Sequence, residues 1–194
     1  MYPTYVEVNG VRYNINTNFK IGIKCDEIGR DETIPDEERA LAIIYLLFGE
    51  QALKDIYNHQ ELKILALKYL SCNKEIEETN EKEDMSFTED YDYIEASFMS
   101  DYGINLEEED MHWWKFCKLI NGLSNSEFGN CCVLNKIRNL RNLDTSQIKD
   151  LKERQKLEKA KQRFALKKKP IKKREFNKEE IQNMNNFFET MERS

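Results

Sequence analysis

The sequence predicts a mainly α-helical protein that begins with one small β-hairpin. Only seven glycines and three prolines interrupt its 194 residues, and most segments carry apolar residues at helical spacing. Asn9-Gly10, between two short alternating segments, is a strong hairpin signal. We therefore expect an N-terminal hairpin, then a multi-helix bundle, then an extended charged C-terminal helix.

The hairpin strands should run from Tyr5 to Val8 and from Val11 to Ile15, because apolar and polar residues alternate there. A lone hairpin is only marginally stable in water, so it must pack on the following helices or on another subunit.

Helices should complete an N-terminal unit over residues 1–73. The first helix should run from about Asn18 to Gly29, and the second should open at Pro35 and run to Gly49. Further helices should follow between Leu53 and Leu70. The longest apolar run, residues 40–48, is far shorter than the ~20 residues a membrane helix needs, so it predicts a buried core helix.

Residues 74–88 form a polar, acidic stretch without periodicity, which predicts a solvated linker. A helical core over residues 89–145 should follow it. Ser86 with Glu89 forms a capping-box pattern, and a helical stripe then runs from Tyr91 to Tyr102 and stops at Gly103.

A second helix of this core contains both tryptophans. Asn105 should cap it at Leu106, with Glu108 as the reciprocal residue, and Gly122 should end it. Its inner face should place Trp113, Cys117 and Ile120 in the core. Trp114 points to one side, where it could meet a second element or a partner.

The sequence contains no pattern typical of catalysis. His112 has no clustered ligands, so we interpret it as a packing or hydrogen-bonding residue and expect neither a metal nor another cofactor. Five cysteines without a CxxC favour reduced thiols in the cytoplasm, and the N-terminus lacks a secretory signal. We therefore expect a protein that is not an enzyme.

The last region, residues 146–194, should contain an exposed charged helix from Ser146 to Leu166, a basic hinge around Pro170 and a short amphipathic helix. Asn177 and Glu180 form a capping box for that short helix. Its apolar residues are Ile181, Met184, Phe187, Phe188 and Met191. They could pack on the chain's own core or, together with Trp114, bind a partner.

The overall charge of −6 hides two oppositely charged stretches, of −13 over residues 74–110 and +9 over residues 149–175. These are either solvated faces or surfaces that pair head to tail between copies. The residues predicted for such self-association are Glu107, Glu108 and Glu109 on one side and Lys167, Lys168, Lys169, Lys172, Lys173 and Arg174 on the other.

The motif KKKPIKKR also allows a nucleic-acid interpretation. Clustered lysines can neutralise phosphates, but aromatic residues are not interleaved with them as single-strand binding requires. A basic-tailed nucleic-acid-binding accessory protein is therefore an alternative, and nucleic acid is not the expected partner.

Four segments carry a family resemblance: VNGVRYNINTNFK, DYGINL, EEDMHWWKF and KIRNLRNLDTSQIKDLKERQK. Together they resemble the gene-product-fifteen family of tailed bacteriophages and of prophages of Gram-positive bacteria, from about Val6 to about Lys168. The resemblance implies a tail morphogenesis protein encoded beside the tape measure gene, acting as a tail assembly chaperone.

On this interpretation the protein self-associates and binds the tape measure protein in the host cytoplasm, without contacting a membrane. A structural component retained in the finished tail is an alternative that the sequence does not separate from a chaperone.

Overall fold

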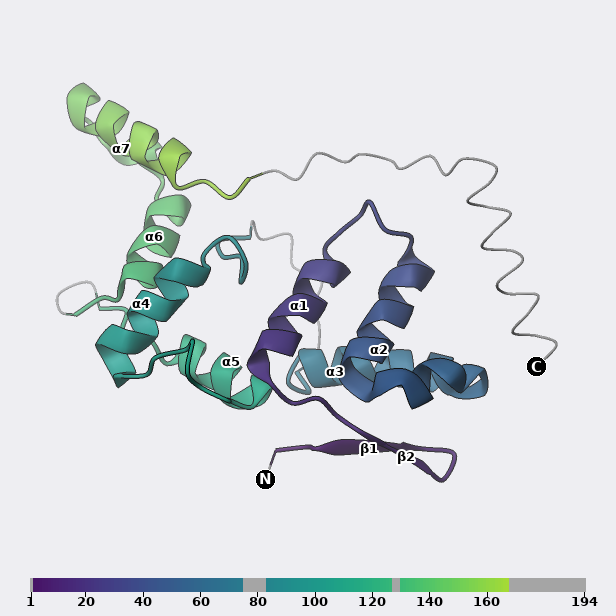
Figure 1. The fold of residues 1–194 in the computed structure, drawn as a ribbon. Coiled ribbons are helices and arrows are strands. Elements are labelled where there is room, and N and C mark those ends of the chain that lie inside the picture. The colour runs from purple at the N-terminus through teal and green to yellow at the C-terminus, as the bar shows by residue number, and fades with distance from the viewer. Residues whose placement is uncertain (1, 75–82, 127–129, 168–194) are drawn as a thin grey trace.

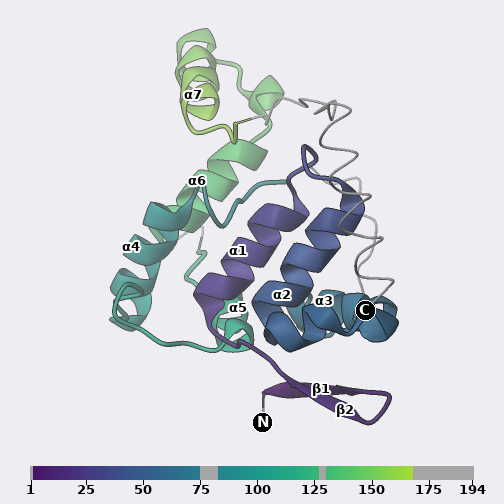
Figure 2. The ribbon, with the colours of Figure 1, turned by 45° about the vertical axis from the view of Figure 1, so that its right-hand side comes forward.

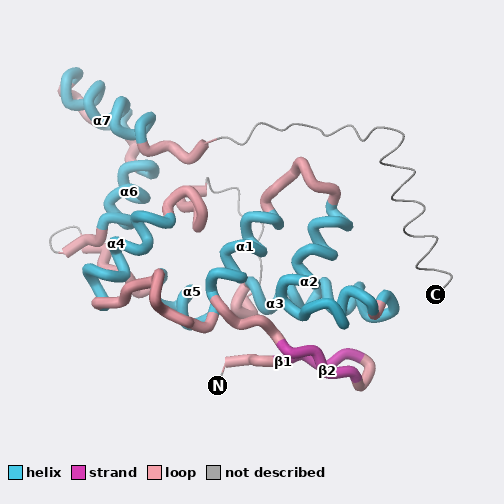
Figure 3. Tube along the Cα trace, in the orientation of Figure 1, coloured by secondary structure: helices cyan, strands magenta, loops and turns pink. Residues whose placement is uncertain are grey.

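The computed structural model describes residues 2–74, 83–126 and 130–167, and within them the chain is mainly helical, as predicted (Figures 1 and 3). Strands occur in the described residues only as the N-terminal hairpin. The elements in chain order are β1 (Tyr5–Val8), β2 (Val11–Asn14), α1 (Phe19–Gly29), α2 (Asp36–Lys54), the 3-10 turn η1 (Ile56–Asn58), α3 (His59–Leu70), α4 (Tyr91–Tyr102), α5 (Trp113–Asn121), α6 (Val133–Asn142), the 3-10 turn η2 (Thr145–Gln147) and α7 (Leu151–Arg163).

The predicted hairpin is confirmed, and it packs against the junction of α2 and α3. Asn9 and Gly10 adopt φ angles of 49° and 79°, the left-handed conformation that a tight two-residue turn requires. Tyr13 is buried on the inner face. The Asn58 amide donates to the Tyr13 hydroxyl at 2.8 Å, and the Asn9 amide donates to Asn58 Oδ1 at 2.8 Å. These bonds tie the turn and the second strand to the helices.

Helices α1 and α2 lie side by side and form one half of the molecule (Figures 1 and 2). Asn18, at the predicted start of the first helix, caps α1, since its side chain accepts a hydrogen bond from the Lys20 N–H. The second helix begins after Pro35 but continues past Gly49 to Lys54. Gly49 adopts a φ of 82° and a ψ of −175°, which are not helical, so the first helical segment is interrupted there as predicted and a second one follows.

The helix predicted to begin at Leu106 begins at Trp113, so that prediction is wrong. Asn105 does accept a hydrogen bond, from the Glu107 N–H at 3.2 Å, but the result is a turn over residues 106–108. Leu106 is nevertheless fully buried.

Backbone pairing with the start of α1 explains the late beginning of α5. The Phe19 N–H donates to the Met111 carbonyl at 2.9 Å, and the Trp113 N–H donates to the Thr17 carbonyl at 2.8 Å. Residues 111–113 therefore enter α5 from an extended segment. Helices α1 and α5 therefore begin next to each other.

The capping box predicted at Ser86 forms with a different acid. Ser86 Oγ accepts from the Glu89 N–H at 3.3 Å, but Asp90, not Glu89, returns the bond by accepting from the Ser86 N–H at 2.9 Å. Helix α4 accordingly starts at Tyr91. It ends at Gly103, whose φ of 66° gives the left-handed cap that the sequence predicts.

The charged helix α7 lies beyond the end of α6, at the edge of the molecule (Figure 1). It was predicted to begin at Ser146, but it begins at Leu151, because Asp150 accepts hydrogen bonds from the N–H groups of Lys152 and Glu153. No residue of α7 is buried.

One hydrophobic core runs through both helical regions. It includes Phe19 of α1, Leu47 of α2 and Leu62 of α3 together with Phe98 of α4 and Phe116 of α5. The described end of the acidic stretch is also held to the body, through the ion pairs Arg30–Glu83 and Arg138–Asp84.

Candidate functional site

The two tryptophans attach α5 to the end of α3 through their indole N–H groups. Trp113 Nε1 donates to the Leu70 carbonyl at 3.0 Å, and Trp114 Nε1 donates to the Tyr69 carbonyl at 2.8 Å. Trp113 is only 3% exposed, whereas Trp114 is half-buried and its ring stacks on Tyr69 with centroids 6.0 Å apart. The indoles thus hold the two helical regions together.

Trp113 lies directly on the backbone of α1 at Gly22. A Cβ atom added at Gly22 would lie 2.3 Å from Cε3 of the indole, much closer than real contacts allow. A glycine inside a helix is destabilising by roughly 0.5–1 kcal/mol relative to alanine. Here the missing side chain provides the space that the indole fills.

His112 forms hydrogen bonds with both ring nitrogens, which confirms its predicted role. Its Nδ1 accepts from the Trp114 N–H at 3.0 Å and so caps α5, and its Nε2 lies 3.0 Å from the Pro3 carbonyl. The imidazole therefore joins the N-terminal segment to the tryptophan helix.

The core face of α5 includes one large residue that the sequence analysis missed. Trp113 and Ile120 are buried and Cys117 is half-buried, while Phe116 is fully buried. The Phe116 ring stacks on Phe19 with centroids 4.6 Å apart. Its position three residues after Trp113 was the available signal, since residues at this spacing share a helix face.

A buried ion pair, Arg141–Asp90, ties α6 to the start of α4. Their side chains are 8% and 1% exposed, and two parallel N–H···O bonds of 2.7 Å join them. Arg141 also donates to the carbonyl groups of Asp84 and Phe164, at 2.7 and 2.6 Å. The hydrogen bond and charge of Asp90 raise the pKa of the Arg141 guanidinium, although burial opposes this shift. Sequence reasoning missed this pair because its members are far apart in the chain.

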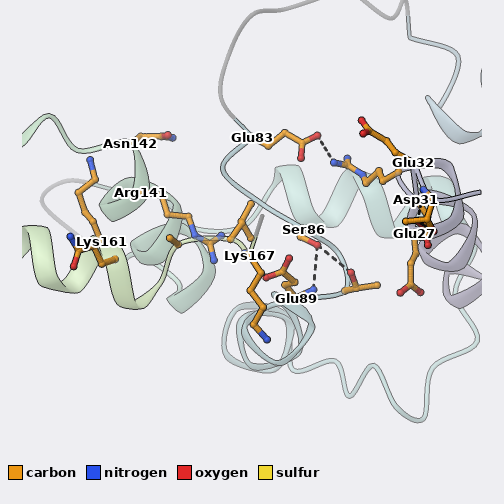
Figure 4. Close-up of a pocket in the computed structure, with 16 residues that line it drawn as sticks. Glu27, Asp31, Glu32, Glu83, Ser86, Glu89, Arg141, Asn142, Lys161 and Lys167 are labelled. Carbon is orange, nitrogen blue, oxygen red and sulfur yellow. Dashed lines mark hydrogen bonds and ion pairs between the residues drawn. The ribbon is translucent and has the colours of Figure 1, made fainter. Parts of the chain in front are cut away.

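Next to this ion pair is a cleft of about 690 Å³ (Figure 4). One wall comes from the end of α1 and the following turn, and the other from the ends of α6 and α7, with residues 83–89 between them. Glu27, Asp31 and Glu32 lie together on the first wall, whereas Arg141 and Lys161 lie on the opposite wall. The cleft is therefore polarised in charge.

The described residues place only part of the predicted interaction surface. Glu107, Glu108 and Glu109 form an exposed turn before α5, and the Glu107 carbonyl accepts a hydrogen bond from Lys20 Nζ at 3.0 Å. Lys167 lines the cleft. The remaining predicted residues lie outside the described residues: Lys168, Lys169, Lys172, Lys173, Arg174, Ile181, Met184, Phe187, Phe188 and Met191.

All five cysteines are free thiols. Burial raises the pKa of the Cys25 thiol to about 12. Cys72 and Cys117 share a hydrogen bond, which lowers the pKa of Cys72 and raises that of Cys117. Lys74 and Lys118 further favour the Cys72 thiolate. Cys72 is therefore more acidic than an ordinary thiol.

Among the described residues, histidine, cysteine and acidic side chains nowhere gather in groups of three or more that could hold a metal ion. No helix in the described ranges combines the length and apolar character needed to cross a bilayer.

Comparison with known proteins gives one match. A family model described as bacteriophage Gp15 protein matches residues 2–166, which include every described helix and strand. No curated protein and no solved structure matches the chain.

Proposed function

We propose that this chain, which belongs to the bacteriophage Gp15 protein family, is a non-enzymatic tail assembly chaperone of a phage or prophage. The family indicates a structural or morphogenetic role in the phage. The observation that carries the proposal is the extent of the match, over residues 2–166, since it covers the whole described fold.

The proposed mechanism is that the protein holds the tape measure protein until the tail tube covers it. A long amphipathic tape measure helix exposes apolar seams until the tail tube covers them, and copies of this protein would shield those seams in the host cytoplasm. The exposed helix α7 supports this role, because it begins the region that leads to the apolar C-terminal residues.

The proposed contacts with the tape measure protein are Trp114 and the apolar residues after Asn177. Trp114 retains exposed surface at the edge of the body, beside Tyr69. Methionine and phenylalanine suit an adaptable apolar contact, and both are frequent among the last residues of the chain.

We also propose that copies self-associate through charge, with Glu107, Glu108 and Glu109 of one copy facing the basic residues after Leu166 of the next. The acidic turn is accessible, since Glu108 and Glu109 are both exposed. Such pairing mainly sets register and encounter rate.

Co-expression with the tape measure protein tests the proposal. We expect the tape measure protein to be recovered in the soluble fraction, bound to this chain, and to be lost from it when residues after Arg174 are deleted. The truncated protein should melt like the full chain, because no residue of the described core lies beyond Ile137. Recovery of free, insoluble tape measure protein beside the full chain would contradict the proposal.

A further inference from the structure

The cleft beside the Arg141–Asp90 pair carries an excess of uncompensated negative charge. Three of the four cations that line it already have partners: Arg141 binds Asp90, Arg30 binds Asp26 and Glu83, and Lys161 Nζ donates to the Leu143 carbonyl. Two of these partners, Asp90 and Asp26, do not line the cleft, so Arg141 and Arg30 do not compensate all of the lining carboxylates.

The acidic wall has carboxylates left over. Glu27 and Glu32 are exposed, line the cleft, and form no hydrogen bond or ion pair within the described ranges. Figure 4 shows both side chains at the same end of the cleft as Asp31. This wall is therefore complementary to a cationic segment.

The chain itself delivers such a segment to the cleft. Lys167 lines the cleft, and its backbone N–H donates to Glu89 Oε2 at 3.0 Å. Residues 168–174, KKPIKKR, follow directly and carry five positive charges and no acid. Each extended residue adds about 3.3 Å, so the next two or three residues suffice to cross a cleft of this size.

We propose that the basic tract of residues 168–174 binds in the cleft of its own chain, with its lysines paired to Glu27 and Glu32. A single exposed ion pair contributes little to binding, because solvent screens it. Several such pairs on a tethered segment are favoured by a high effective concentration, of order mM for a short linker. The cleft is thus an intramolecular docking site for the tract.

Docking has a consequence that rests on the proposed self-association. A tract held by Glu27 and Glu32 is withdrawn from the acidic turn Glu107–Glu109 of another copy. The cleft and the second copy therefore compete for the same lysines, and the cleft restrains assembly of free protomers.

A carbodiimide cross-link tests the docking directly, because the reagent joins carboxylates and amines that are in contact. In dilute full-length protein at low salt we expect Glu27 or Glu32 to be joined to Lys168 or Lys169 in the monomer band, as read by peptide mass spectrometry. The Lys54–Glu50 pair, at 2.7 Å, is the internal positive control. Cross-linking of the control pair without the cleft pair overturns the proposal, and so does a cleft pair found only in the dimer band.

A charge-neutral variant gives a second readout. Glu27→Gln with Glu32→Gln should accelerate tryptic cleavage within residues 168–174, whereas the matched variant Glu37→Gln with Glu61→Gln, two exposed acids on α2 and α3, should not. Equal cleavage rates in both variants and the parent protein would overturn the docking.

Sedimentation of the same variants separates the two proposals. If self-association also holds, the cleft variant should form larger oligomers than the parent protein. If the cross-link shows docking but neither protein forms an oligomer, the self-association is refuted and the docking is not.

Discussion

Trp113 fills the space left by the missing side chain of Gly22, and its removal should therefore be costly. Its ring covers Gly22, and its N–H satisfies the Leu70 carbonyl. We expect Trp113→Ala to lower the free energy of unfolding by about 3–5 kcal/mol, because a large buried side chain leaves a cavity. Trp114→Ala should cost less, since that ring is half-buried. Denaturant titration of both variants measures the difference, and a reversed order would contradict this packing.

The cysteines should differ in reactivity because their pKa values shift in opposite directions. At about pH 8, near the ordinary thiol pKa, iodoacetamide should modify Cys72 before Cys25 or Cys117, since the thiolate is the reactive form. Raising the pH should speed modification of Cys25 only as the pH approaches 12, because its raised pKa keeps it neutral below that value. Peptide mass spectrometry reads the order, and unfolded protein, in which the three thiols should react alike, is the control. Faster modification of Cys25 than of Cys72 in the folded protein would refute the assignment.

For single residues, the sequence predicted the roles that depend on local patterns. His112, beside the tryptophans and without ligand partners, was interpretable as a hydrogen-bonding residue. Arg141 and Asp90 were not predictable as partners, because their contact depends on how α4 and α6 pack. The cleft was missed for the same reason.

Between elements, the Arg141–Asp90 pair should be the most sensitive charged contact. Arg141→Met leaves the buried Asp90 carboxylate without its partner, which should cost about 3–5 kcal/mol. The matched variant Arg154→Met removes an exposed pair with Glu158 on α7 and should cost no more than about 1 kcal/mol. Thermal melting of both variants measures this. Similar melting temperatures would show that the buried pair contributes no more than a surface pair.

Helix boundaries show where local signals lose to tertiary contacts. The capping pattern at Asn105 predicted a helix that starts at Leu106. Instead, residues 111–113 pair with the start of α1, and the helix begins only after this pairing. At Gly49, where the second helix was predicted to end, non-helical backbone does interrupt α2, and a further helical segment follows to Lys54. Asp150 and Gly103, by contrast, cap their helices as their residue types predict.

The two oppositely charged stretches of the molecule predict that its self-association depends on salt concentration. If the acidic turn of one copy pairs with the basic tract of the next, self-association should weaken steeply between low and physiological ionic strength, because the Debye length shortens to about 8 Å at 0.15 M. Sedimentation at tens of micromolar protein measures the oligomer mass. An unchanged mass across this range, or a strict monomer in every condition, would remove the electrostatic model.

The fold class was predictable from the whole sequence, because helical periodicity and the Asn9-Gly10 turn are local and strong. The shared core of the two helical regions was not, since it depends on which apolar faces meet. Phe116 illustrates this limit: its stacking partner Phe19 belongs to a helix almost a hundred residues earlier.

A tail assembly chaperone, as proposed for this chain, binds the tape measure protein while the tail is built, whereas a structural component stays in the finished tail. Quantitative mass spectrometry of assembly intermediates and of purified finished particles distinguishes the two roles. We predict several copies of this chain per tape measure protein in the intermediates and none in finished particles. Its presence at fixed stoichiometry in finished tails would contradict the chaperone account and identify a structural component instead.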